Sequence, residues 1–319
     1  MKTSKFSYAL TALTVILCVF ISSSSAKDIN ARVGTSAFSF LKINVGARAV
    51  GMGGAFTGLA DDESALYYNP SGIASLEGRR FIAGYHNYFV DLQSGFVGYI
   101  QQLNERQFIA GYINYLNYGD FIKTDELGNV DPGGAFSGGD LLIAATFAMK
   151  FEDQFMFGAS AKFIYEKLES YSATGAAFDL GGKYTSDRSR YQAGIAIQNL
   201  GFQLSALGEG KNDLPITVRG GLAVRPKEIP VMFTGDLIAP IDNNPVYAIG
   251  GEYLDFKPFY IRMGWNSFGS NYRTADSDDK WAGMSFGVGF DHKDLHLSYA
   301  FSPGAELGES HRITLTGGF

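Results

Sequence analysis

The four histidines are the residues best suited to metal binding or acid–base chemistry, and they are scattered along the chain. They stand at positions His86, His292, His296 and His311, and no pair has the spacing of a metal-ligand motif. The one cysteine, Cys18, lies near the N-terminus, so no disulfide or thiolate site is expected beyond it. These residue types predict no metal site.

Two glycine-rich words resemble phosphate-binding motifs only in part. In "GEGKND", residues 208–213, Asn212 stands where a phosphate loop needs Ser or Thr after the lysine. In "GMGGAFTG", residues 51–58, the glycines lack the dinucleotide-binding spacing. We therefore expect no cofactor, and because no catalytic constellation stands out, we predict that the protein is not an enzyme.

Acidic residues exceed basic ones. The chain has a net charge of −6, which becomes −8 when the first 26 residues, with Lys2 and Lys5, are set aside. No basic stretch with interleaved aromatic residues occurs, so we expect no nucleic-acid partner. The acidic word "DSDD", residues 276–279, offers weak calcium ligands, but a solvated loop is the favoured interpretation.

The first 26 residues have the pattern of a secretory signal peptide. Lys2 and Lys5 precede an apolar run from Tyr8 to Ile21, and a Ser-x-Ala pattern ends at Ala26. The apolar run is shorter than the roughly 20 residues that span a bilayer as a helix. An exported chain with 40 Gly, 18 Tyr and 26 Phe and no later long apolar run is typical of an outer-membrane β-barrel.

From residue 79 onward the sequence alternates between apolar and polar or small residues. In residues 154–168, Phe155, Phe157 and Phe163 share one face, and Ser160 and Lys162 share the other. The pattern predicts a closed antiparallel barrel of about fourteen transmembrane strands. They are expected at 79–91, 94–103, 106–119, 140–151, 154–168, 176–187, 190–200, 217–226, 230–238, 245–255, 258–267, 281–291, 294–302 and 310–319.

The connections between these strands are expected to differ at the two ends of the barrel. Those after even-numbered strands are tight, whereas several after odd-numbered strands are long, notably 120–139, 201–216 and 268–280. In outer-membrane barrels the short turns face the periplasm. The pattern predicts a location in the outer membrane of a Gram-negative bacterium, with both termini in the periplasm and the wall against lipid.

Alternation also predicts which charged side chains point into the lumen. They are Lys162, Glu166, Asp179, Lys183, Arg219, Asp236, Glu252, Arg262 and Arg312. Five are cationic and four are anionic, a balance that favours ion pairs across a filled lumen over an ion-selective channel. The chain ends on Phe319, after Ile313 and Leu315 on the same face, which resembles the C-terminal signal that the barrel-assembly machinery recognises.

Residues 27–78 do not alternate and are expected to plug the barrel formed by residues 79–319. Asp61 or Asp62 can cap a short helix, and Asn69 followed by Pro70 is a second helix start. The preceding word "GARAVGMGGAFTGLA" is small and flexible, which suits close packing against other backbone. We call residues 27–78 the hatch.

Residues 40–76 resemble the N-terminal region of PorV/PorQ-type proteins, which belong with the FadL-like outer-membrane transporters. The family's glycine element corresponds to Gly46, Ala47, Arg48, Gly51, Met52, Gly53 and Gly54. Its second element corresponds to Asp62, Ala65, Tyr68, Asn69, Pro70 and Gly72, with Ser71 where the transporter motif has Ala. The resemblance implies a fourteen-stranded barrel with an N-terminal hatch in its lumen.

The resemblance leaves two functions open. PorV-type members are accessory or shuttle proteins of the type IX secretion system, whose partners are secretion proteins and the C-terminal signals of cargo. FadL-like members instead transport hydrophobic small molecules, such as long-chain fatty acids or aromatics, passively across the outer membrane. Because the predicted inward positions are charged or small rather than contiguously apolar, the first function is favoured.

Overall fold

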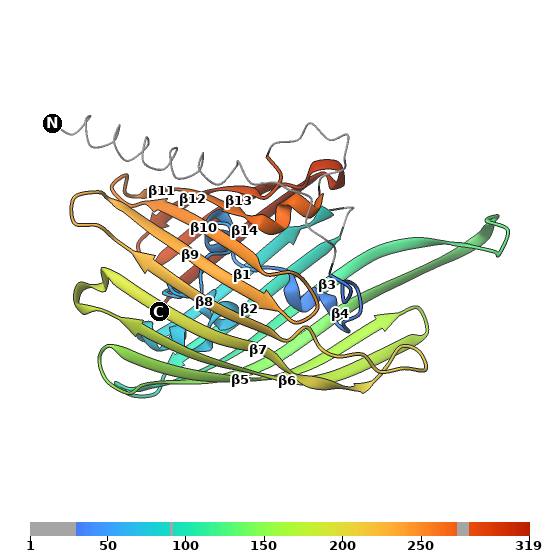
Figure 1. Cartoon of the computed structure of the whole chain (residues 1–319), viewed down its shortest axis with the longest axis horizontal. Helices are drawn as coiled ribbons and strands as arrows, with labels where there is room; N and C mark the ends of the chain where they lie inside the picture. The colour runs from blue at the N-terminus through green and yellow to red at the C-terminus, as the bar shows by residue number, and fades with distance from the viewer. Residues whose placement is uncertain (1–29, 90–91, 273–280) are drawn as a thin grey trace.

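The computed structural model describes residues 30–89, 92–272 and 281–319. It confirms a closed antiparallel barrel of fourteen strands (Figure 1). Each strand pairs with the strands before and after it in the sequence, and the pairing of β1 with β14 closes the barrel. The strands are β1 Arg79–Asn87, β2 Gln93–Gln102, β3 Gln107–Thr124, β4 Val130–Lys150, β5 Phe155–Leu168, β6 Tyr171–Thr185, β7 Tyr191–Ser205, β8 Thr217–Val224, β9 Val231–Pro240, β10 Val246–Tyr253, β11 Phe259–Asn266, β12 Met284–His292, β13 Leu295–Pro303 and β14 Glu309–Gly318.

Alternation along each strand separates an outward apolar face from an inward face. On β5, Phe157 and Phe163 are exposed, whereas Ser160 and Lys162 are buried. A shift of one residue would exchange the two faces, so this pattern fixes the register of the wall. We call the end of the barrel that holds the connections after even-numbered strands the short-turn end, and the other the long-loop end.

The connection predicted as a loop over 120–139 is wrong. β3 and β4 continue as a hairpin that turns at residues 125–129, and Figure 1 shows it projecting well past the rest of the wall. Phe121 of β3 stacks on Phe136 of β4 with a centroid distance of 5.1 Å. β7 likewise continues to Ser205, into the loop expected at 201–216, and β5 and β6 are joined by residues 169–170 alone.

The hatch lies inside the ring of strands and contains four short helices. They are η1 Ser39–Lys42, α2 Ala47–Gly51, α3 Ala65–Tyr68 and η2 Pro70–Ser75. Almost every residue from Ala47 to Ala74 is buried. Three further short helices, η4 Asp187–Ser189, η5 Ser267–Tyr272 and η6 Ala305–Leu307, lie in connections.

Two predicted features lie outside the described residues, namely the signal peptide at 1–26 and the acidic word at 276–279. Within the described part of the chain, no helix has the length and apolar character needed to cross a membrane.

Candidate functional site

The hatch follows a path that its glycines and one Asn-Pro pair make possible. Gly46 precedes α2 with φ of 75°, and Gly53 and Gly54 turn the chain away from it with φ of 71° and 79°. These left-handed conformations favour glycine because it has no β-carbon. Asn69 caps η2 by accepting a hydrogen bond from Ser71 N at 3.2 Å, with Pro70 at the first position of that helix.

The hatch packs against a row of inward-facing glycines in the wall. We call it the glycine track; it consists of Gly158, Gly181, Gly194, Gly221, Gly250, Gly264 and Gly287, one each from β5, β6, β7, β8, β10, β11 and β12. At Gly194 a β-carbon would meet the carbonyl of Thr57, and at Gly264 it would meet the backbone of Met52 and Gly53, in both cases closer than 3.0 Å. The hatch backbone therefore lies directly on the wall.

Between β5 and β12, β9 is the strand that contributes no glycine to the track, and it holds the hatch with a carboxylate. Asp236 Oδ2 accepts hydrogen bonds from Phe56 N at 3.1 Å and Thr57 N at 2.8 Å. Arg219 of β8 lies 3.6 Å from the same oxygen and donates to the Gly54 carbonyl at 2.9 Å. These buried charged groups replace the hydrogen bonds that the irregular hatch backbone does not make with itself.

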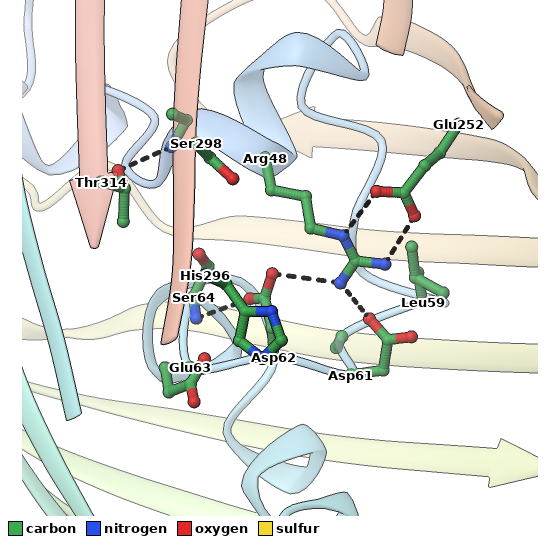
Figure 2. Close-up of polar contacts among 12 residues, drawn as sticks. Arg48, Leu59, Asp61, Asp62, Glu63, Ser64, Glu252, His296, Ser298 and Thr314 are labelled. Atoms are coloured by element: carbon green, nitrogen blue, oxygen red, sulfur yellow. Dashed lines mark hydrogen bonds and ion pairs between the residues drawn. The ribbon is translucent and has the colours of Figure 1, made fainter. Parts of the chain in front are cut away.

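Arg48 joins the hatch to β10, the strand that pairs with β9 (Figure 2). It donates from Nε and Nη2 to the two carboxylate oxygens of Glu252, at 3.0 and 2.8 Å. Its Nη1 donates to Asp61 at 2.6 Å and to Asp62 at 3.1 Å. Burial alone would lower the pKa of Arg48, but the charges of Asp61, Glu252 and Asp62 hold it well above its usual value. Nε of Arg262 also donates to Oε1 of Glu252, at 2.6 Å.

The two lysines predicted to point into the lumen make different contacts, one with the hatch and one within the wall. Lys183 donates to the carbonyls of Leu59 and Ala60, at 2.5 and 2.8 Å, and so holds the hatch. Lys162 instead pairs within the wall with Asp179, at 2.5 Å. It also donates to Asn199 at 2.9 Å.

Glu166 and Arg312 are the remaining two residues of the set predicted to point into the lumen. Glu166 is half-buried and stands opposite Asp140 in the β4–β5 register. Arg312 is buried and donates to Ser310 at 2.8 Å, and Ser310 also bonds to Nε2 of His86 at 2.9 Å.

Several hatch contacts were not anticipated from the sequence. Glu63 accepts a hydrogen bond from Arg80 at 2.6 Å, and Gln198 donates to the Tyr67 carbonyl at 2.5 Å. Burial and the nearby charge of Asp62 raise the pKa of Glu63 above its usual value, although Arg80 opposes this. The alternation along β7 indicates that Gln198 points inward. A neutral amide at such a position, however, does not show whether the side chain contacts the hatch or only lines the lumen.

The prediction that the lumen face is charged or small is wrong for β1–β4 and holds only in part for β5, where Met156 and Ile164 lie beside Gly158, Ser160 and Lys162. Their inward residues include large apolar side chains, which pack with Leu66 and Ile73 of the hatch. They are Ile82, Phe96, Ile100, Phe108, Tyr112, Leu116, Leu142, Met156 and Ile164. One side of the lumen is therefore an ordinary hydrophobic core.

Cavities remain at both ends of the hatch. At the short-turn end a cavity of about 340 Å³ is lined by charged residues, among them Arg48, Asp61 and Arg262. At the long-loop end a cavity of about 310 Å³ has a more apolar lining, which includes Leu41 and Tyr67. In the described residues, no group of three His, Cys, Asp or Glu side chains is arranged to hold a metal ion.

The C-terminal residue, Phe319, is 75 % exposed at the short-turn end. Its ring lies 6.4 Å from that of Phe81 and 6.3 Å from that of Tyr99, measured between centroids. The predicted assembly signal therefore lies in an aromatic cluster on the outside of the barrel.

A closed fourteen-stranded barrel with an N-terminal hatch in its lumen is the architecture of the FadL-like outer-membrane proteins. The chain belongs to the PorV family: the model of "Type IX secretion system protein PorV" matches residues 25–224. Fold and family point to the outer membrane of a Gram-negative bacterium. No curated protein matches the sequence.

Solved structures with a similar fold include hydrocarbon channels and a FadL homologue. The Pseudomonas putida toluene transporter TodX shares 16 % identity at a TM-score of 0.58, over 86 % of this chain and 96 % of that one. The CymD monoaromatic hydrocarbon channel shares 13 % identity at a TM-score of 0.59, over 89 % of this chain and 99 % of that one. A Pseudomonas aeruginosa FadL homologue shares 12 % identity at a TM-score of 0.54, over 85 % of this chain and 97 % of that one. At such identities the similarity shows the fold.

Proposed function

We propose that this protein is an accessory barrel of a type IX-like secretion and surface-attachment system. In this role it binds the C-terminal signals of exported cargo and helps to deliver the cargo to the attachment machinery. The family match supports the proposal. The observation that carries it is the direct packing of the hatch backbone against the barrel wall.

A hatch of this kind favours a scaffold over a conduit. Its backbone lies on the glycine track, and Arg48 ties it to Glu252 in a largely buried network. Separating one partner of a buried ion pair costs about 3–5 kcal/mol, so displacement of the hatch would need a large compensating interaction. Cargo would then bind to the barrel's rims or outer wall and not pass through its lumen.

The orientation of the barrel is part of the proposal. Short turns face the periplasm in outer-membrane barrels, which puts Phe319 on the periplasmic side. The start of the described hatch lies at the other end, because Lys42 pairs with Asp242 at 2.5 Å and Ala37 N donates to the Asp213 carbonyl at 3.0 Å. We therefore propose a periplasmic position only for the C-terminal end.

A secretion reporter tests this function. A fluorescent protein fused to a type IX C-terminal signal should reach the cell surface in the parent strain and accumulate in the periplasm when the gene is deleted. A plasmid copy of the full chain should restore surface attachment. Unchanged delivery in the deletion strain would contradict the role in secretion.

The cavity at the long-loop end supports a second candidate, passive transport of hydrophobic compounds. Its volume of about 310 Å³ and lining with Leu41, Ile43 and Tyr67 suit a small apolar molecule. Proteoliposomes with the full chain would then take up labelled toluene or a long-chain fatty acid faster than empty liposomes. Equal rates would exclude this candidate and leave the secretion role intact.

A further inference from the structure

β7 extends past its neighbour β8 at the long-loop end. The ladder between them joins Tyr191–Gln198 to Thr217–Val224, and in the described chain it has no pair beyond Gln198. On its other side β7 stays paired with β6 as far as Ser205, opposite Thr174. Residues 199–205 therefore form a strand edge, which we call the β7 edge.

The chain's own loop lies beside the β7 edge without joining its ladder. The contacts of residues 206–216 with the edge are made through side chains: Asn212 N donates to Oε1 of Gln203 at 2.8 Å, and Nδ2 of Asn199 donates to the Pro215 carbonyl at 3.2 Å. Among the described residues, no backbone-to-backbone hydrogen bond joins 199–205 to this loop. The edge thus presents a row of backbone N–H and C=O groups that a further strand can pair with.

A buried bulge fixes the point at which the two strands separate. Asn199 has φ of 59°, and the β6–β7 register shifts between Phe178 and Leu180. Asn199 N donates to Asp179 Oδ1 at 2.8 Å, and the paired Lys162 holds the Asn199 side chain. A bulge bends its strand and redirects the residues after it, so the direction of the β7 edge is built into the wall.

The outward side chains of the β7 edge are apolar. Leu200, Phe202 and Leu204 are 46 %, 60 % and 46 % exposed, and no residue from 199 to 205 is charged. We propose that the β7 edge binds an extended, uncharged segment of a partner polypeptide, with alternating apolar side chains, by adding it to the barrel sheet. Main-chain hydrogen bonds would supply affinity, and the apolar stripe would select the partner's side chains.

An extended strand is the occupant that this surface suits. Hydrocarbon cannot bond to the N–H and C=O groups of an open edge, and a helix uses its own backbone groups internally. Only a strand both completes the ladder and extends the apolar stripe. The β7 edge belongs to the wall, and the proposal uses no contact of the hatch, so its failure would leave the proposed secretion role intact.

A spin-labelled peptide tests the proposal on the full chain in detergent micelles. The probe is a capped ten-residue peptide of alternating threonine and leucine with a nitroxide, and the protein carries a second nitroxide at Leu204→Cys. The matched control is Leu297→Cys on β13, where the leucine is 47 % exposed but paired on both sides, with Phe290 and Leu315. We expect saturable binding with dipolar broadening at position 204 and none at 297.

A second peptide separates strand pairing from adsorption to an apolar surface. N-methylation of three alternate backbone amides keeps every side chain but removes donors from one edge of the peptide. It should weaken binding about tenfold or more, because several backbone hydrogen bonds are lost together. Equal binding by the methylated peptide, equal broadening at 204 and 297, or no saturable binding would each overturn the proposal.

Discussion

The two sides of the lumen hold the hatch in different ways. On β6–β12, and at Gly158 of β5, the wall offers glycines and charged side chains, and the hatch presents its backbone to them. On β1–β5 the wall offers large apolar side chains, and the hatch presents Leu66 and Ile73. The first side depends on close approach and hydrogen-bond geometry, the second on buried apolar area, so substitutions on the two sides should differ in kind and size.

The Arg48 network gives the largest expected effect on the polar side. Arg48→Ala removes the partner that Asp61 and Asp62 share and leaves Glu252 with Arg262 alone, which should cost about 3–5 kcal/mol. The free energy of unfolding in urea, measured in micelles, checks this. Arg48→Lys should recover only part of the loss, because an ammonium cannot form the bidentate pair. Full stability in Arg48→Ala would mean that the network does not hold the hatch.

Two neighbouring glycines test the close approach. A β-carbon at Gly221 would meet both Oδ1 of Asp236, which binds the hatch, and the backbone N of Gly58, whereas a β-carbon at Gly220 would have no neighbour within 4 Å. Gly221→Val should therefore lower the free energy of unfolding by about 1–3 kcal/mol through overpacking. Gly220→Val is the matched control and should be nearly neutral. Equal losses in the two variants would show that the glycine track does not seat the hatch.

The apolar side should respond as an ordinary core. Ile164 is fully buried, so Ile164→Val should cost about 0.5–1.5 kcal/mol through lost apolar contact. Ile143→Val, at a position 47 % exposed on the outer face, serves as its control and should have little effect. A loss at Ile164 as large as that of Arg48→Ala would remove the distinction between the two sides.

The smallest expected effect is a pH dependence that comes from Glu63. Its raised pKa means that the folded state holds the proton more tightly than the unfolded state, whose carboxyl has a pKa near 4.5. The stability contributed by the protonated form is thus present below that value and is lost as pH rises through the higher pKa of the folded state. Thermal midpoints of the parent chain and Glu63→Gln should show this loss only in the parent. The same slope in both would exclude Glu63 as its source.

The fold was predictable because lipid and lumen impose a strict alternation. The strand expected at 258–267, for example, is β11 at Phe259–Asn266. The β3–β4 extension was missed because residues 125–139 contain Pro132 and five glycines, a loop-like composition. The hairpin is shown by the pairing of the two strands, as between Phe121 and Phe136.

The contacts of the hatch were less predictable than the wall. Parity indicated an inward direction for Glu252 and Arg262, but nothing local in the sequence pairs Glu252 with Arg48, which lies 204 positions away. The contacts of the glycine track were hidden from the sequence for the same reason, because they too join distant parts of the chain. Inward glycines can be counted from the sequence, but whether water, a side chain or another backbone fills the space beside them depends on how the hatch crosses the lumen.

Single-channel conductance in planar bilayers tests most directly whether the hatch is a fixed stopper. The full chain should remain closed across repeated voltage steps, and deletion of residues 40–76 should open a stable conducting pore, because the lumen would lose the segment that fills it. A steady conductance through the full chain, or no change on deletion, would contradict a lumen closed by a hatch fixed to its wall.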